Sequence, residues 1–228
     1  MNSKNEQKTK NKKRSYFFYN FVKITGAIPT LIYMRTRVIS PNNQKNSKIK
    51  GGVVITSNHV SFIDPVIIHC VFAGRNLHCL ATKELFSSKA KNFFFTQMHC
   101  IKVDKDNFSM QSFHEVRNLL KAEKAVVIFP EGQVNHELGE VLAFKAGAIL
   151  MAHQSNKPVL PVYIVKREKW YQRQTVVVGE PLDIRAICGG MPTMDQLKLA
   201  SDTLREKEIE LMEYYINKYL KGEKQTNG

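Results

Sequence analysis

The chain has 228 residues, of which 43% are hydrophobic, and it carries a net charge of +14. That length and hydrophobic content predict one globular domain, or one domain with an appendage, and exclude a disordered chain. The charge predicts attraction to nucleic acid, an anionic membrane surface or a phosphorylated substrate, without choosing among them. The four cysteines form no C-x-x-C pair, so we interpret them as reduced core thiols of a cytoplasmic protein.

Residues 1–14 form a polar, basic arm, which we expect to be disordered. Such an arm could bind RNA, but no aromatic residue is interleaved with its charges, as a stacking platform requires. Its composition therefore argues against nucleic acid as the partner.

The next segment, residues 15–40, begins with an apolar, aromatic stretch that ends at Met34 and contains one charge, Lys23. As a straight helix it would span roughly 28 Å, close to the ~30 Å of a bilayer core. Gly26 and Pro29 interrupt it, so we expect two short helices that form a membrane-associated hairpin in one leaflet. The alternative is an ordinary helical hairpin buried in the fold.

Strand and helix patterns alternate through residues 50–220, which predicts an α/β domain with a central, mostly parallel sheet flanked by helices. The expected strands are 52–57, 77–82, 99–103, 125–129, 158–165 and 175–179. The expected helices are 62–73, 84–96, 108–122, 142–153 and 194–219. We interpret the apolar stripe of the last helix as core packing rather than a site. Residues 221–228 form a polar tail.

The most informative motif follows the first expected strand and contains His59, Ser61 and Asp64. A strand end is where an open α/β sheet usually holds its site. Residues five apart diverge by roughly 140° on a helix. A contact between His59 and Asp64 therefore requires a turn after the histidine and a helix that begins at Asp64. Such a pair would form a general base oriented by an acid, and Ser61 would support the turn.

Two further motifs follow later strands. Lys102 and Lys105 come at the end of the strand expected at 99–103, where cations suit a phosphate. Glu131 and Gly132 follow the next strand. The glycine permits a tight turn with exposed backbone N–H groups, and the glutamate could accept hydrogen bonds from substrate hydroxyls.

Together these stretches resemble the glycerolipid acyltransferase family, and within it most closely the 1-acylglycerol-3-phosphate (lysophosphatidic acid) acyltransferases. The resemblance covers roughly residues 50–180. It depends on four blocks in the family's order, which are His59–Asp64, Lys102–Lys105, Phe129–Asn135 and Val159–Val162. Residues 15–40 resemble the family's membrane hairpin.

The sequence departs from the family pattern at two places. The third block usually continues Thr-Arg-Ser, whereas residues 133–135 are Gln-Val-Asn. The second block ends in Lys105 where arginine is usual, so a point charge replaces a planar fork. Lys102, Lys105 or Lys145 would have to compensate, the last within a Phe-Lys-Ala-Gly stretch that also resembles the family.

The resemblance implies transfer of a fatty acyl group to the free hydroxyl of 1-acylglycerol-3-phosphate, which forms phosphatidic acid in phospholipid synthesis. The donor would be an acyl thioester, either acyl-CoA or acyl carrier protein. His59, oriented by Asp64, would be the catalytic base. The expected substrate-binding residues are Lys102, Lys105, Glu131, Gly132 and Lys145. No metal or bound cofactor is implied. The enzyme would be peripheral or monotopic, on a membrane lipid surface at the cytoplasmic face.

Several alternatives stay open at this point. The acceptor could be another lysolipid or glycerol-3-phosphate. A non-enzymatic basic protein that binds membrane or RNA could keep an inactive form of the fold, although the intact His59–Asp64 block argues against it. A serine hydrolase would need a Gly-x-Ser-x-Gly elbow, which this sequence lacks.

Overall fold

The computed structural model describes residues 16–42, 49–104, 109–135, 137, 140–169 and 171–221. Its strands are β1 (Arg37–Ile39), β2 (Val53–Ser57), β3 (Leu77–Thr82), β4 (Ile101–Val103), β5 (Ala125–Ile128), β6 (Val159–Ile164) and β7 (Thr175–Val178). Its α-helices are α1 (Tyr16–Val22), α2 (Ile28–Met34), α3 (Asp64–Val71), α4 (Lys89–Gln97), α5 (Met110–Lys121), α6 (Gly147–Ser155), α7 (Ile184–Cys188) and α8 (Met194–Tyr215). A 3-10 turn, η3 (Lys83–Phe86), and two π-helical segments, η1 (Lys23–Ala27) and η4 (Ile216–Lys221), complete these elements.

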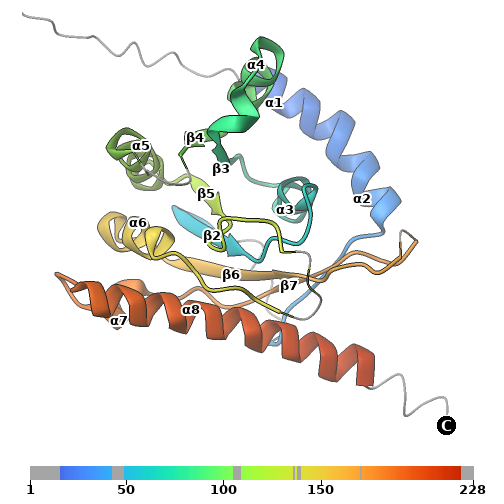
Figure 1. Ribbon diagram of the computed structural model, residues 1–228. Coiled ribbons are helices and arrows are strands. Elements are labelled where there is room, and N and C mark those ends of the chain that lie inside the picture. Colours follow the sequence, from blue (N-terminus) through green and yellow to red (C-terminus); the bar gives the residue numbers. More distant parts are fainter. Residues whose placement is uncertain are drawn as a thin grey trace, which may run out of the picture.

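The strands form one seven-stranded sheet in the order β1-β7-β6-β2-β5-β3-β4 (Figure 1). Each neighbouring pair is parallel except β6 with β7, which is antiparallel. The mostly parallel α/β sheet predicted from the sequence is therefore confirmed. Strand β1 and helix α7 were not expected, and the helix expected at 142–153 begins only at Gly147.

Helices cover both faces of the sheet, which explains why its central strands read as continuous apolar runs. Side chains alternate along β2. Val54 packs in a core cluster with residues of α5, α6, α7 and α8, whereas Val53 and Ile55 pack in a second cluster with residues of α3. All five residues of β2 are buried as a result.

The structure of the N-terminal segment corrects the helical hairpin that the sequence predicted for residues 15–40. Residues 16–34 run as one continuous helix, in which the π-helical turn η1 joins α1 directly to α2 (Figure 1). Proline cannot donate a helical hydrogen bond and its ring crowds the preceding turn, and a wider π turn accommodates both effects. Thr25 and Thr30 donate their hydroxyl hydrogens to the carbonyls of residues 21 and 26.

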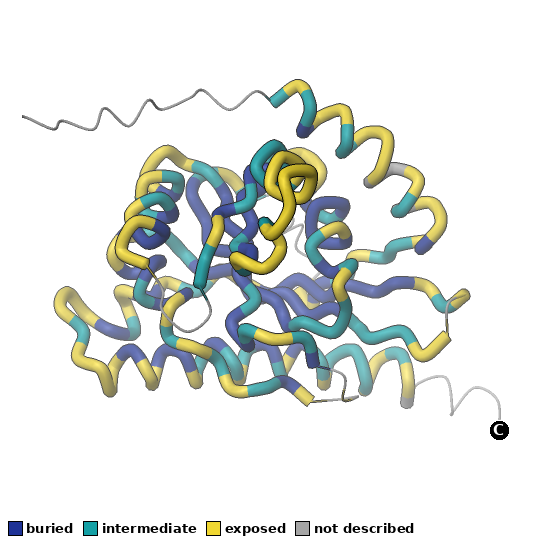
Figure 2. The backbone as a smooth tube through the Cα atoms, turned by 45° about the horizontal axis from the view of Figure 1, so that its top comes forward, coloured by how far each residue is buried: buried dark blue, intermediate teal, exposed yellow. Residues whose placement is uncertain are grey.

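This N-terminal helix has a buried side and an exposed side (Figure 2). Tyr19 is fully buried and its hydroxyl accepts a hydrogen bond from the Leu77 amide at 3.0 Å. Phe21 and Ile32, in contrast, are 57% and 73% exposed. Within the described residues, no helix is both long and apolar enough to cross a bilayer.

The strand order decides which sequence motifs can meet. Strands β2 and β5 are neighbours, with Thr56 opposite Ile128, so the segments after their carboxyl ends lie side by side. Strand β4 is three positions away from β2, or roughly 14 Å at about 4.8 Å per strand. The first and third sequence blocks are therefore adjacent, and the second lies at the sheet edge.

Candidate active site

The turn after β2 joins His59 to Asp64, as the sequence predicts. Asp64 is the first residue of α3 and is completely buried. Its Oδ2 accepts a hydrogen bond from His59 Nδ1 at 2.8 Å and from the backbone amides of Val60 and Ser61 at 2.7 and 2.8 Å. Because a carboxylate only accepts hydrogen bonds, this contact places the imidazole proton on Nδ1. The other ring nitrogen, Nε2, then carries a lone pair that can take a proton.

Asn58 fixes the position of the His59–Asp64 turn on the sheet. Its side-chain amide donates to the Ile164 carbonyl at 3.0 Å and accepts from the Ile164 amide at 2.7 Å. This pair of bonds extends the β2–β6 ladder by one side chain. The Asn135 amide donates to the His59 carbonyl at 2.6 Å. The backbone of His59 is therefore tied to the loop that follows β5.

The segment after β5 forms the other wall of the site. The Phe129 ring stacks on the His59 imidazole, with ring centroids 4.3 Å apart and planes inclined by 24°. Gly132 has a φ of +71°, a left-handed conformation that favours glycine. A Cβ on Gly132 would also lie 3.1 Å from Lys145 Nζ. The structure thus brings the Lys145 ammonium against the turn of the third block at Gly132.

Glu131 lies behind this loop, with 6% of its surface exposed. Burial raises the pKa of its carboxyl to about 7, against the opposing effect of the His59 and Leu142 backbone amides. Neither carboxyl oxygen makes a hydrogen bond of good geometry with a described residue. This carboxyl is buried in the structure. The expected contact between Glu131 and substrate hydroxyls therefore stays a prediction.

A polar stripe on α8 supports the same loop, and the sequence interpretation of α8 as core packing missed it. Ser201 donates to the Phe144 carbonyl at 3.3 Å, and Arg205 Nε donates to the Val141 and Leu142 carbonyls at 3.0 Å each. These bonds accompany an irregular, non-helical course of residues 141–145, and Lys145 lies on that stretch.

Glu208 completes the stripe and is fully buried. Burial raises the pKa of its carboxyl well above the usual range, the Thr56 hydroxyl opposes the rise, and the nearby Glu131 carboxyl adds to it. Residues 201, 205 and 208 are four and three apart, so they share one side of the helix. Polar residues at that spacing, between Leu197 and Leu211 of the apolar stripe, were the signal in the sequence that could have revealed this role.

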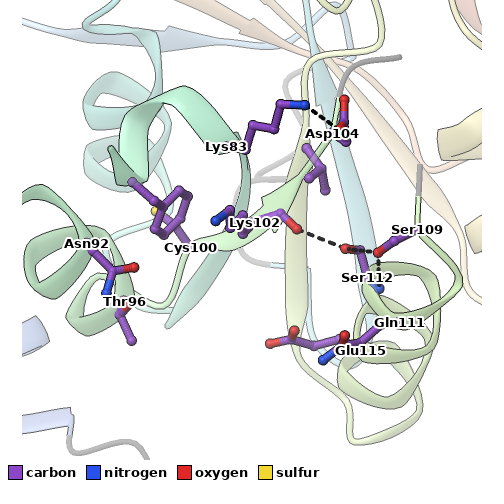
Figure 3. Close-up of a pocket in the computed structure, with 12 residues that line it drawn as sticks. Lys83, Asn92, Thr96, Cys100, Lys102, Asp104, Ser109, Gln111, Ser112 and Glu115 are labelled. Atoms are coloured by element: carbon purple, nitrogen blue, oxygen red, sulfur yellow. Dashed lines mark hydrogen bonds and ion pairs between the residues drawn. The ribbon is translucent and has the colours of Figure 1, made fainter. Parts of the chain in front are cut away.

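Lys102 lies in a separate cavity at the sheet edge. This cavity has a volume of about 410 Å³, and none of the described residues that line it belongs to the turn at His59 or the loop at Gly132 (Figure 3). Within it, Lys83 Nζ pairs with Asp104 Oδ2 at 2.6 Å, and Ser112 Oγ donates to the Lys102 carbonyl at 2.8 Å. A role for Lys102 in acceptor binding stays a prediction. Lys105 lies outside the described residues, and so do the basic arm and the last seven residues of the polar tail.

The described residues outside this site contain other histidines, which make local structural contacts. His69 Nδ1 lies 2.7 Å from the Pro65 carbonyl, and His153 Nε2 lies 2.7 Å from the Gly189 carbonyl. His99 stacks on Tyr19. No three histidine, cysteine or carboxylate side chains come together in the described part of the chain as a metal site requires.

Comparison with known proteins gives consistent relatives. A 1-acyl-sn-glycerol-3-phosphate acyltransferase of Bacillus subtilis is 26% identical over 74% of this chain and 85% of its own length. One from Borreliella burgdorferi is 24% identical over 69% of this chain and 63% of its own. The human 1-acyl-sn-glycerol-3-phosphate acyltransferase alpha is 30% identical, with 52% of this chain and 42% of the human protein aligned.

The fold has a solved counterpart. The crystal structure of the 1-acyl-sn-glycerophosphate (LPA) acyltransferase PlsC from Thermotoga maritima superimposes with a TM-score of 0.62. The match covers 86% of this chain and 79% of that one, at 19% identity, which shows a shared fold. The Acyltransferase family profile matches residues 37–165, more than half of the chain, including the His59–Asp64 turn and the loop after β5. The chain belongs to the acyltransferase family.

Proposed function

We propose that this acyltransferase moves a fatty acyl group from an acyl thioester to the free hydroxyl of 1-acylglycerol-3-phosphate, forming phosphatidic acid for phospholipid synthesis. The observation that carries the proposal is the His59–Asp64 contact, which leaves Nε2 as the proton acceptor. The names of the relatives support the choice of acceptor.

In the proposed mechanism, His59 Nε2 takes the proton of the acceptor hydroxyl as its oxygen attacks the thioester carbonyl. The carbon–sulfur bond then breaks, and the imidazolium returns the proton to the departing thiolate. No acyl-enzyme forms, because the acceptor is itself the nucleophile. General base catalysis of this kind contributes roughly 10²–10⁴-fold, and the buried Asp64 keeps the imidazole in the required tautomer.

The third block lacks the family's usual arginine, and we assign its charge to Lys145. The position of its ammonium over Gly132 supports this assignment, because a lysine can bind phosphate as a point charge. Lys102 and Lys105 are further candidates at the sheet edge. The backbone of the tight turn at Gly132, whose own N–H donates to the Phe129 carbonyl at 3.1 Å, would lie against the glycerol part of the acceptor.

The proposed site is held at a membrane surface, because the lysolipid and a long-chain donor both partition into lipid. The exposed apolar side of the N-terminal helix supports peripheral or monotopic binding. We place the enzyme at the cytoplasmic face, where acyl-CoA and acyl carrier protein would both be available. The reaction needs no bound cofactor, because the thioester arrives activated, so activity is expected to survive dialysis against EDTA.

An acceptor panel tests this proposal. Purified full-length protein is given either acyl-CoA or acyl carrier protein, together with lysophosphatidic acid, glycerol-3-phosphate, lysophosphatidylcholine or lysophosphatidylglycerol. We expect phosphatidic acid as the main product, detected by mass spectrometry. A preference for glycerol-3-phosphate or another lysolipid would select the alternative acceptor. No transfer to any of them by a folded protein would favour a non-enzymatic, membrane-binding role.

A further inference from the structure

The connection between β6 and β7 is strongly basic. Among residues 165–174, Lys166, Arg167, Lys169 and Arg173 are cationic, and only Glu168 is acidic. The mechanism uses none of these residues. A concentration of one charge sign in a single connection points to an anionic partner.

The base of this connection lies against the catalytic turn. A cavity of about 220 Å³ separates the two and is lined by Ser61, Ile63 and Asp64 on one side and by residues 165–169 on the other. A partner bound to the basic connection would therefore be beside the turn that carries Ser61 and Asp64.

The same connection is tied to the carboxyl end of α2. Arg173 Nε donates to the Arg35 carbonyl at 2.7 Å, and the Gln174 amide donates to the Met34 carbonyl at 3.0 Å. Figures 1 and 2 both show the tip of the β6–β7 connection beside the end of α2. The basic connection and the N-terminal helix thus form one neighbourhood of the surface.

Exposed apolar side chains border the basic connection. Phe62, inside the catalytic turn, is 84% exposed, and Ile32 and Tyr33 near the end of α2 are 73% and 64% exposed. Tyr171, in the connection itself, is 57% exposed, and Lys169 Nζ lies 5.8 Å from the centre of its ring. Apolar and aromatic groups beside lysine and arginine match the boundary of an anionic bilayer, where rings insert and cations meet headgroups.

We propose that the β6–β7 connection is a second membrane contact, in which Lys166, Arg167 and Lys169 bind the headgroups of anionic phospholipid. Together with the N-terminal helix it would orient the protein, so that the His59 turn faces the lipid. The proposal rests on the proposed function for the reason to dock, but the contact itself is measurable without any acyl transfer.

The test uses the full chain with Lys166, Arg167 and Lys169 all changed to glutamine. Arg173 is kept, because it bonds to the backbone of α2. A matched control replaces three lysines of α5 and α8, which cover the sheet face opposite α2 and α3. Its substitutions are Lys121→Gln, Lys198→Gln and Lys207→Gln. Binding is measured by sedimentation with vesicles of phosphatidylcholine alone or with about 30% phosphatidylglycerol, an anionic lipid content at which each lost basic contact weakens adsorption several-fold.

We expect the triple variant to lose about tenfold or more of its affinity for anionic vesicles, with little change on neutral ones, while the control variant binds like the wild type. Wild-type binding to anionic vesicles by the triple variant would overturn the proposal. So would unchanged vesicle binding combined with a raised KM for acyl-CoA or acyl carrier protein, because the cations would then serve the donor. An inactive wild type that still shows the tenfold difference would contradict the proposed function and leave this contact in place.

Discussion

At the scale of single residues, the site depends on one buried carboxylate that serves three donors. Asp64 Oδ2 accepts from the His59 ring and from two consecutive backbone amides. The amide bonds hold the turn closed, and the ring bond orients the imidazole. One side chain thus determines both the shape of the turn and the tautomer of the histidine, which is why the motif needs an acid at this spacing.

Lys145 carries a prediction at this scale. If its ammonium binds the acceptor phosphate, Lys145→Ala should raise the acceptor KM roughly 10- to 100-fold, the equivalent of a lost hydrogen bond to a charged group. The donor KM should change little. Steady-state kinetics on lysophosphatidic acid would measure both constants, with the exposed Lys198→Ala as the control.

The comparison with Lys102→Ala and Lys105→Ala locates the phosphate site. An acceptor KM that is unchanged in Lys145→Ala but raised in either of these variants would move the site to the sheet edge. That result would also separate the phosphate from the loop that carries Gly132.

At the scale of elements, α8 supports the loop of residues 141–146, which carries Lys145. Arg205 and Ser201 bind three carbonyls of residues 141–144, and Glu208 lies under the end of β2. The helix therefore contacts the loop through backbone carbonyls and the end of β2 through a buried carboxyl.

The two buried carboxyls predict a particular dependence of stability on pH. The pKa values of Glu131 and Glu208 are raised by burial, that of Glu131 to about 7. The folded state therefore binds more protons than the unfolded state above the ordinary glutamate pKa. Stability should fall as pH rises from about 5 to about 8, because the buried carboxyls must ionise or the protein must unfold.

Glu208→Gln should make the fall in melting temperature over this range shallower, because glutamine imitates the protonated acid. Glu210→Gln, an exposed change on the same helix, should leave the slope as it is. Thermal melts at several pH values would measure both. A Glu208→Gln slope equal to that of the wild type would show that this carboxyl does not titrate with folding.

How much the sequence predicted depended on how local each feature was. The His59–Asp64 contact joins residues five apart, and strand β2 consists mainly of β-branched residues buried on both faces, so both could be inferred. Strand β1 could not, because three residues become a strand only by pairing with β7, far along the chain. Residues 142–146 have a helical pattern, but bonds from α8 hold their carbonyls and delay α6 to Gly147.

At the scale of the whole molecule, the N-terminal helix is both a part of the core and a candidate membrane anchor. Deletion of this helix would remove the buried Tyr19 and its bond to Leu77. A loss of lipid binding by the truncated protein could then not be distinguished from unfolding. Substitution of its exposed side avoids this difficulty.

Phe21→Ser, Ile24→Ser and Ile32→Ser together should reduce binding to neutral and anionic vesicles by roughly tenfold or more, since apolar insertion does not depend on lipid charge. The three residues are 57%, 60% and 73% exposed, so the melting temperature should barely change. The matched control changes Met191, Met194 and Leu199 to serine; these residues lie in or just before α8 and are 96%, 75% and 59% exposed. If the helix variant sediments with vesicles as well as the control does, the helix is not an anchor.

The central claim is that His59 is the base for acyl transfer to lysophosphatidic acid. Formation of phosphatidic acid by purified wild type and His59→Ala tests it most directly, with the exposed His114→Ala as the control and circular dichroism to verify folding. We predict product from the wild type and from His114→Ala, and a rate at least 10²–10⁴-fold lower from His59→Ala. A folded His59→Ala enzyme that forms phosphatidic acid at close to the wild-type rate would contradict the account.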